Sequence, residues 1–329
     1  MTEKIHVQIP ESSGDILWFK EISKDDTAKV GGKGANLGEM FKAGMPIPPG
    51  FCVTAQAYER FLEQAGIKEE IARILQIDVE DNEALHKASK EIQEIIARQS
   101  MPEDTRKAIT EAYSGLGKGD EFVAVRSSAT AEDLPEASFA GQQATFLNVR
   151  EADKVVRAVQ ECWASLFTAR AIYYRTSKNF NHMDVLISVV VQKMVDSKKA
   201  GVMFTVNPAT NDDGQIIIEG AFGLGEMVVS GRTSPDLYII DKLSGNIKDI
   251  HVNEQKSALF RNEAGENYTH ELDPQKANSQ VLSDDEMTRI AELGRKIEKH
   301  YGFPQDIEWA VDGKIFVTQS RPVTTFKKG

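Results

Sequence analysis

The stretch DIEWAVDGKIFVTQSR, residues 306–321, carries the strongest structural signal in this chain. Strand-like runs flank Asp312-Gly313, a dipeptide typical of the tight turn that joins two antiparallel strands. The pattern therefore predicts a hairpin with strands at residues 306–311 and 314–319.

Four polar side chains of this hairpin are expected to converge on one face, because alternate residues of a strand share a face. They are Asp306, Glu308, Gln319 and Arg321. Two carboxylates and an amide oxygen suit Mg²⁺, which takes oxygen ligands and shares others with phosphates. Arg321 adds positive charge for such phosphates. The alternative interpretation is a solvated polar face with a surface salt bridge.

Outward from the hairpin, short strands and helices are mixed along the chain. A long helix is predicted over residues 152–174, and helix starts are predicted at Thr54 and, by a capping box, at Ser283. Further strands are predicted at residues 122–125, 145–149, 185–191, 200–206, 215–219 and 236–241. This mixture favours an α+β fold over a doubly wound parallel sheet.

Composition excludes several classes of protein. The chain has 329 residues and a net charge of −11, from 39 basic and 50 acidic side chains. The acidic balance disfavours a nucleic-acid partner, which needs a basic face. Cys52 and Cys162 are the two cysteines, too few and too far apart for a disulfide framework. With no apolar run long enough to span a bilayer, a cytoplasmic protein without a membrane partner is expected.

A glycine-rich stretch, Gly31-Gly32-Lys33-Gly34, precedes a short helix predicted at residues 35–43. Glycines let backbone N–H groups approach an anion, and Lys33 could supply charge to a phosphate. The spacing is not that of a P-loop. The alternative is a turn into the helix with Lys33 solvated.

Two further stretches suit a nucleotide. Arg126 follows a predicted buried strand and offers bidentate phosphate contact, with Gly141 placed where a flexible lid could hinge. The alternative is an ion pair of Arg126 with Glu132 or Asp133. The apolar segment 189–195 could line an adenine pocket, or could be an ordinary core strand.

Taken together, these motifs resemble the nucleotide-binding domain of the phosphoenolpyruvate synthase family, which includes pyruvate phosphate dikinase and rifampicin phosphotransferase. The resemblance covers roughly residues 18–325. The stretches that carry it are residues 30–40, 44–51, 125–133, 138–142, 201–208, 219–226 and 319–322.

The resemblance implies an ATP-grasp-like fold in which two lobes clamp Mg-ATP. The implied organisation is an extension at 1–17, an N-terminal lobe at 18–190 with a helical segment at 54–115, a C-terminal lobe at 191–325 and the start of a linker at 326–329.

The resemblance also implies roles for particular residues. Lys33, Arg126 and Arg321 would be the catalytic charges that hold the phosphates, with Gly141 and Thr145 in or beside the loop over them. The base and nucleoside would meet Gln192, the Lys193-Met194-Val195 backbone and Glu219. Glu308 and Gln319 would bind Mg²⁺, with Asp306 nearby.

In the family's reaction, ATP donates its β,γ-phosphoryl portion to a histidine on a separate domain. Pyruvate then becomes phosphoenolpyruvate on a barrel domain, with AMP and phosphate as products. Neither the phosphohistidine domain nor the barrel is expected in this chain. The alternatives are the ATP-binding domain of an antibiotic phosphotransferase of the rifampicin type, and a nucleotide-binding module without catalysis. The choice between ATP and GTP stays open.

Overall fold

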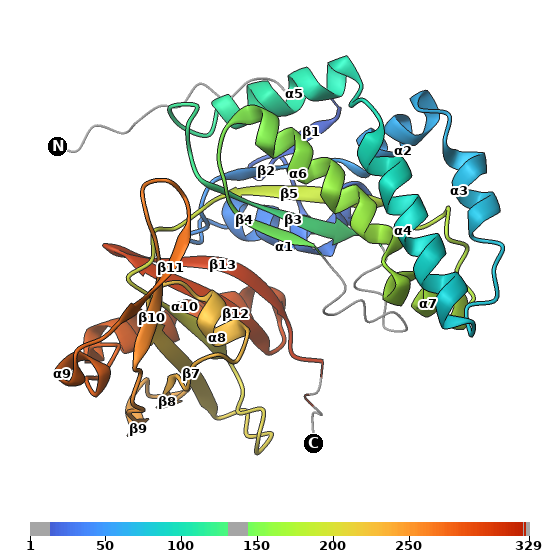
Figure 1. The fold of residues 1–329 in the computed structure, drawn as a ribbon. Coiled ribbons are helices and arrows are strands. Elements are labelled where there is room, and N and C mark those ends of the chain that lie inside the picture. Colours follow the sequence, from blue (N-terminus) through green and yellow to red (C-terminus); the bar gives the residue numbers. More distant parts are fainter. Residues whose placement is uncertain (1–13, 131–143, 325, 327–329) are drawn as a thin grey trace. The chain divides into compact units, whose positions relative to one another are not determined.

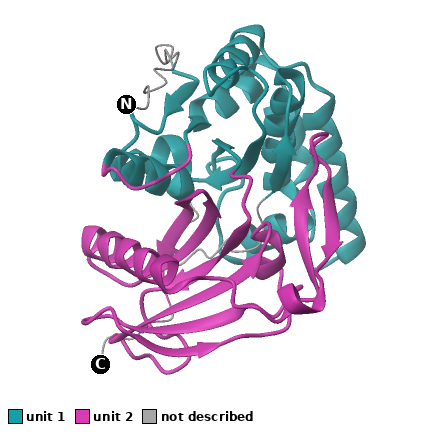
Figure 2. Cartoon of the chain, turned by 90° about the vertical axis from the view of Figure 1, so that its left-hand side faces the viewer, with its two compact units in different colours: residues 1–42, 49–194 teal, residues 43–48, 195–329 magenta. Residues whose placement is uncertain are grey.

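The computed structural model describes residues 14–130, 144–324 and 326. The chain forms two compact units, which Figure 2 colours separately: unit 1 within residues 1–42 and 49–194, and unit 2 within residues 43–48 and 195–329. The expected lobe boundary at 190/191 differs from this division. Segment 43–48 also joins unit 2, where the N–H of Val317 donates to the carbonyl oxygen of Pro46 at 3.0 Å.

Unit 1 is built on a five-stranded antiparallel sheet in the order β1-β2-β5-β3-β4 (Figure 1). Its strands are β1 (Ile16–Trp18), β2 (Gly50–Val53), β3 (Val123–Ala129), β4 (Thr145–Val149) and β5 (Ile187–Lys193). Its helices are α1 (Thr27–Lys42), α2 (Ala55–Gln64), α3 (Lys68–Ile74), α4 (Asn82–Arg98), α5 (Glu103–Ser114), α6 (Ala152–Ala164) and α7 (Ala169–Ser177), with 3-10 turns at Lys24–Asp26 and Ser165–Phe167.

The main apolar core of unit 1 lies between this sheet and helices α2, α4, α5 and α6. Trp163 of α6 is fully buried there against the rings of Tyr58 and Phe61, with centroids 5.8 and 4.9 Å away. Helix α1 contacts β3 and β5 but adds no residue to this core. It therefore packs on the other face of the sheet, where backbone and side-chain groups of α1 meet the strands.

The predicted start of α2 is confirmed, since Thr54 Oγ1 accepts a hydrogen bond from the N–H of Ala57 at 3.3 Å. The single long helix predicted at residues 152–174 is wrong. Thr168 has extended dihedral angles and caps a new helix by accepting from the N–H of Ala171, so α6 and α7 are separate.

The fold also begins earlier than the extension predicted at residues 1–17. Ile16 starts β1 and is buried, and Asp15 accepts a hydrogen bond from the N–H of Thr54 at 2.8 Å. Residues 1–13 lie outside the described part. In the described ranges, no helix is long and apolar enough to cross a membrane.

Unit 2 holds a six-stranded antiparallel sheet in the order β13-β12-β6-β7-β8-β9 and a separate hairpin of β10 and β11. Its strands are β6 (Lys199–Phe204), β7 (Gln215–Phe222), β8 (Asp236–Asp241), β9 (Ile247–His251), β10 (Ser257–Arg261), β11 (Asn267–Glu271), β12 (Gln305–Asp312) and β13 (Lys314–Pro322). Its helices are α8 (Glu226–Val229), α9 (Pro274–Ala277) and α10 (Asp284–Tyr301).

Helix α10 packs on the six-stranded sheet, with Gly294 against Met203 of β6. The capping box predicted at Ser283 is confirmed, because its side chain accepts from the N–H of Glu286 and the Glu286 carboxylate accepts in return from the N–H of Ser283. Together the helices and antiparallel sheets confirm the expected α+β class.

Candidate functional site

The glycine-rich stretch is a kink inside α1. Gly31 has φ 66° and ψ 171°, a left-handed φ that favours glycine, and the helix resumes beyond it. Lys33 lies directly after this kink, and its Nζ donates to the carbonyl oxygen of Ser127 at 2.8 Å. The turn expected to lead into a helix at residue 35 therefore lies within a longer helix, and it holds Lys33 against β3.

Arg126 lies beside two other predicted site residues. In the sheet register Arg126 is directly opposite Thr145 of β4, and directly opposed residues share a face. The carbonyl of Ser127, the next residue along β3, holds the ammonium group of Lys33. The structure thus brings Lys33, Arg126 and Thr145 together in unit 1. Gly141 lies outside the described residues.

Gln192 shares this face of the sheet. It is two residues along β5 from Val190, which pairs with Arg126. Gln192 is buried, and its Nε2 has no hydrogen-bond partner in the described part of the chain. A buried amide donor of this kind is costly to leave unsatisfied, so it is a candidate to meet a ligand.

The backbone that follows Gln192 is already engaged within unit 1. The N–H of Lys193 donates to the carbonyl of Pro49 at 2.9 Å, and the N–H of Met194 donates to the carbonyl of Phe122 at 2.8 Å. These two donors are used inside the unit, so they are not the groups that would meet a base. Val195 is the first residue of this segment in unit 2.

In unit 2, one row of residues crosses four strands. Val202 of β6 lies opposite Glu219 of β7 on one side and opposite Glu308 of β12 on the other. Glu308 in turn lies opposite Gln319 of β13. Because directly opposed residues share a face, Glu219, Glu308 and Gln319 all project from the same face of the sheet.

Asp306 joins this face two residues before Glu308 and lies opposite Arg321, whose Nε donates to Asp306 Oδ2 at 2.8 Å. Burial raises the pKa of Asp306, and the charge of Glu308 adds to that rise while Arg321 opposes it. Burial and the charge of Asp306 likewise raise the pKa of Glu219. The carboxylates are therefore crowded and poorly solvated, and a cation at this face would relieve them.

A β-bulge sets this arrangement. Glu308 pairs with Gln319, whereas the next residue, Trp309, pairs with Val317, so Thr318 is an extra residue on β13. Thr318 Oγ1 donates to the carbonyl oxygen of Glu308 at 3.3 Å. The bulge places Gln319 beside Glu308, where an amide oxygen and a carboxylate can act together.

These residues fit a magnesium ion that is shared with a nucleotide. Among the described residues, no group of three or more His, Cys, Asp or Glu side chains could hold a metal ion. Mg²⁺ commonly uses one or two carboxylates plus phosphates and water rather than an all-protein cage. Glu308 and Gln319, with Asp306 and Glu219 on the same face, have the donor chemistry for that mode.

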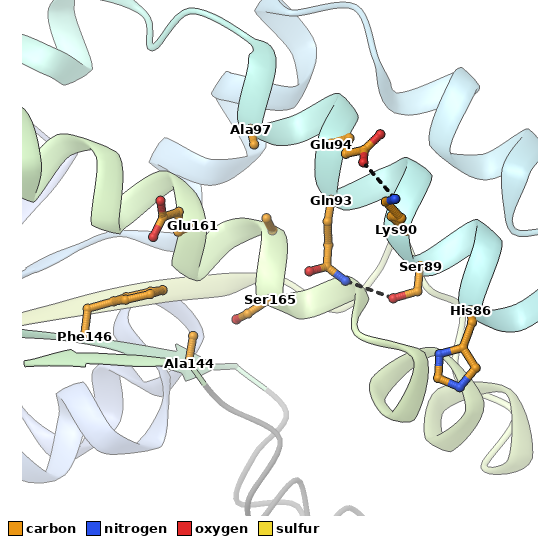
Figure 3. A pocket seen from close by; sticks show the side chains of 11 residues that line it. His86, Ser89, Lys90, Gln93, Glu94, Ala97, Ala144, Phe146, Glu161 and Ser165 are labelled. Atoms are coloured by element: carbon orange, nitrogen blue, oxygen red, sulfur yellow. Dashed lines mark hydrogen bonds and ion pairs between the residues drawn. The ribbon is translucent and has the colours of Figure 1, made fainter.

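A groove of about 760 Å³ lies elsewhere in unit 1 (Figure 3). Its polar side chains largely bind one another, since Gln93 donates to Ser89 Oγ at 2.9 Å and Lys90 pairs with Glu94 at 3.8 Å. None of the predicted site residues that the structure describes lines it. The lining residues are His86, Ser89, Lys90, Gln93, Glu94, Ala97, Ala144, Phe146, Glu161, Ala164 and Ser165.

Comparison with known families agrees with the site chemistry. The family model of the pyruvate phosphate dikinase AMP/ATP-binding domain matches residues 27–329. The chain belongs to this family. Membership confirms the resemblance that the sequence motifs indicated and makes this an AMP/ATP-binding domain.

Curated relatives of this dikinase-family domain are longer proteins. The chain is 52% identical over 316 residues to a probable phosphoenolpyruvate synthase of Methanothermobacter thermautotrophicus, covering 94% of this chain and 46% of that protein. It is 50% identical over 331 residues to one of Methanocaldococcus jannaschii, covering 98% and 28%. It is 45% identical over 359 residues to the phosphoenolpyruvate synthase of Pyrococcus furiosus, covering 95% and 44%. The chain thus spans less than half the length of these relatives.

Sequence reasoning on this dikinase-family domain missed some of the residues that shape the site. It assigned no individual role to Ser127, Ser128 or Ser188. A signal was present, because Ser188 interrupts the apolar run at residues 185–191. A buried hydroxyl in such a run requires a hydrogen-bond partner.

Proposed function

We propose that this chain is an ATP-grasp-like domain that binds Mg-ATP and prepares its β,γ-phosphoryl portion for transfer to a histidine on another domain. The strongest support is the register of β12 and β13, which puts Glu308 and Gln319 side by side on the face that also carries Asp306. Membership of the dikinase AMP/ATP-binding family supports an adenine nucleotide as the ligand.

In unit 1, Lys33 and Arg126 are the proposed phosphate ligands. Their closeness at the middle of β3 concentrates positive charge where anionic oxygens would be held. Phosphoryl transfer depends mainly on positioning and on neutralising charge, which is what these two groups supply. Thr145, opposite Arg126, offers a hydroxyl to the same phosphates, and Gly141 is assigned to the loop above them.

Gln192 and the segment that follows it are the proposed base-binding elements. The buried Nε2 of Gln192 is a donor for a ring nitrogen or a carbonyl oxygen of the base. With the N–H groups of Lys193 and Met194 engaged elsewhere, their carbonyls and that of Val195 are proposed to accept from an exocyclic amino group. Adenine carries such a group, and the choice of ATP over GTP rests on membership of the AMP/ATP-binding family.

In unit 2, Glu308 and Gln319 are proposed to hold Mg²⁺, and Glu219 to bind the nucleoside. When bound, Mg²⁺ would neutralise phosphate charge as it builds up during transfer. Arg321 is proposed to face the transferred phosphates. Its bond to Asp306 holds the guanidinium on the same face as the metal ligands.

The reaction proposed for the whole protein is that of phosphoenolpyruvate synthase, as the names of the relatives indicate. An imidazole nitrogen would attack the β-phosphorus, the bond from the α,β-bridging oxygen to that phosphorus would break, and AMP would leave. Water would then release phosphate, and the remaining phosphoryl group would pass to pyruvate. The histidine domain and the pyruvate-binding barrel are proposed partners outside this chain.

Calorimetric titration with Mg-ATP tests the nucleotide site directly. Arg126→Ala and Glu308→Ala should each weaken binding by about tenfold or more, which is ~1.4 kcal/mol, and chelation of Mg²⁺ should mimic Glu308→Ala. Matched controls are Arg157→Ala on α6 and Glu292→Ala on α10, because both side chains are exposed and change the same charges.

Two results would refute the assignment. Saturable Mg-ATP binding that both site variants leave intact would place the nucleotide elsewhere. Equal losses in the site variants and in their controls would show a general effect of charge. A parallel titration with Mg-GTP tests the base, and tighter binding of GTP than of ATP would contradict the proposal that ATP is the nucleotide.

A further inference from the structure

A pair of buried serines holds the kink of α1 from the side of the sheet. Ser128 of β3 and Ser188 of β5 are directly opposed in the register, and both are fully buried. Ser188 Oγ donates to the carbonyl oxygen of Val30 at 2.5 Å. Ser128 Oγ accepts from the N–H of Gly34 at 3.3 Å. One serine therefore binds the chain before Gly31, and the other binds it after.

These two hydrogen bonds hold the two ends of one distorted turn of helix. In a straight α-helix the N–H of Gly34 would donate to the carbonyl of Val30, four residues earlier. Gly31 lies inside that turn with non-helical dihedral angles, so the turn departs from that geometry. Buried backbone groups need partners. The serine pair supplies one to each, which makes the kinked form the stable one.

The turn is also packed closely on β3. A Cβ at Gly31 would overlap the hydroxyl and carbonyl oxygens of Ser128 and lie 2.7 Å from its carbonyl carbon. Lys33 belongs to the same turn, and its Nζ binds the carbonyl of Ser127, the residue next to Arg126. The position of the Lys33 ammonium group is therefore set by the contacts that hold the kink.

We propose that Ser128 and Ser188 are positioning residues that keep Lys33 beside Arg126, ready for the phosphates of ATP. This inference rests on the proposed function, in which Lys33 and Arg126 bind those phosphates. Among the described residues, the hydrogen bonds of the two hydroxyls go to the backbone of α1, so the serines act through the turn and not on the nucleotide. Loss of either one weakens the hold on Lys33 and leaves the base-binding elements in place.

The first test compares the affinities for Mg-ATP and AMP, because AMP lacks the β- and γ-phosphates. Ser128→Ala and Ser188→Ala should each weaken Mg-ATP about tenfold and change AMP by less than about twofold. The matched control is Ser89→Ala, which removes another buried hydroxyl of unit 1, one that donates to the carbonyl of Phe167 at 2.8 Å. Equal losses for Mg-ATP and AMP, or losses no larger than those of Ser89→Ala, would overturn the proposal.

The second test asks whether the serines act through Lys33. In a Lys33→Ala background, Ser188→Ala should have no further effect on Mg-ATP affinity, because the group that it positions is gone. A full tenfold loss in that background would show that the serine works by another route, and would overturn the positioning role.

Backbone amide exchange, measured without nucleotide, separates this inference from the proposed function. The amides of residues 31–35 should exchange faster in Ser128→Ala and Ser188→Ala than in Ser89→Ala. Unchanged exchange would show that the two serines do not hold the kink, and would overturn the proposal whatever the titrations show. Faster exchange together with Mg-ATP binding that is insensitive to Lys33→Ala would show that the serines hold the kink but that Lys33 does not bind the phosphates. The effect proposed for the serines on ATP would then be refuted as well.

Discussion

Replacing Gly31 with alanine is expected to destabilise unit 1 by about 2–6 kcal/mol. The first contribution comes from φ 66° with ψ 171°, a conformation that is essentially restricted to glycine and that costs a residue with a Cβ about 1–3 kcal/mol. The second is steric, because the new methyl group would overlap the hydroxyl and carbonyl oxygens of Ser128. Overpacking of this kind costs about 1–3 kcal/mol, and here the obstacle includes backbone that cannot rotate away.

Gly66 offers a control with a positive φ and no steric obstacle. Its φ is 63°, nearly that of Gly31, and a Cβ there would meet nothing within 4 Å. Gly66→Ala should therefore carry only the cost of a positive φ, about 1 kcal/mol. The difference between the two variants measures the further cost at the kink, which includes the contact with Ser128.

Urea unfolding followed by tryptophan fluorescence is a suitable assay, since Trp18 and Trp163 are both buried in unit 1. With a urea dependence of about 2 kcal/mol per molar, the steric difference of 1–3 kcal/mol separates the two midpoints by roughly 0.5–1.5 M. Equal midpoints for Gly31→Ala and Gly66→Ala would refute the reasoning, because the kink would then not be packed against β3.

Two further predictions concern buried polar groups. Asp236 accepts hydrogen bonds from the backbone N–H groups of Asn253 at 3.0 Å and Val281 at 2.8 Å, one on each carboxylate oxygen. Asp236→Asn must turn its NH₂ toward one of them, so a loss of about 3 kcal/mol is expected in the thermal unfolding of unit 2, and a variant as stable as the parent would contradict this. Burial and then Arg175 lower the pKa of His182 from 6.5 to about 4. As the pH falls, His182 is protonated in the unfolded chain before it is protonated in the folded chain. The contribution of neutral His182 to stability is therefore present above pH 6.5 and should be lost as the pH drops toward 4, by about 1 kcal/mol after allowing for partial exposure. Urea midpoints at pH 7 and pH 4, set against His182→Gln, check this, and an equal fall in the variant would rule out His182 as the cause.

The fold could be predicted where the interacting groups are close in sequence. The cap at Thr54 and the capping box at Ser283 involve partners three residues away, and both are confirmed. The break between α6 and α7 was missed, because apolar spacing runs through residues 152–174 and only the extended Thr168 interrupts it. Segment 43–48 was also missed, since its place in unit 2 depends on a bond to Val317, far away in the chain.

The candidate site shows the same limit. Taken alone, the patterns at Lys33 and Arg126 left a solvated lysine and a surface ion pair as alternatives. The structure places the Lys33 ammonium group on the carbonyl of Ser127, the residue next to Arg126, across a separation of 94 residues. Ser188 lies farther still from its partner Val30, at 158 residues. No local sequence pattern predicts such a contact. The roles of Lys33 and Arg126 were therefore inferred from a resemblance, and the hold of the two serines on the kink could be inferred only from the fold.

The final hairpin was predicted by a different route. Asp312-Gly313 was treated as a two-residue turn, which would pair Val311 with Lys314. In the structure Gly313 alone forms the turn, with φ 65°, and Asp312 itself pairs with Lys314. This change shifts the register of β13 by one residue. A shift of one residue sends every later side chain to the opposite face of the sheet.

The bulge at Thr318 adds a second shift of one residue, which returns the later side chains to the original face. Without it, Gln319 would lie on the face of Ile307 and Trp309, away from the carboxylates. With the bulge, Gln319 lies opposite Glu308, and Arg321 lies opposite Asp306. The sequence argument therefore reached the correct face while missing both the one-residue turn and the bulge, because two shifts of one residue together restore the face. A hairpin that carried only one of them would have the same strands and the same sequence signals, and its amide and guanidinium groups would point away from the carboxylates of Asp306 and Glu308.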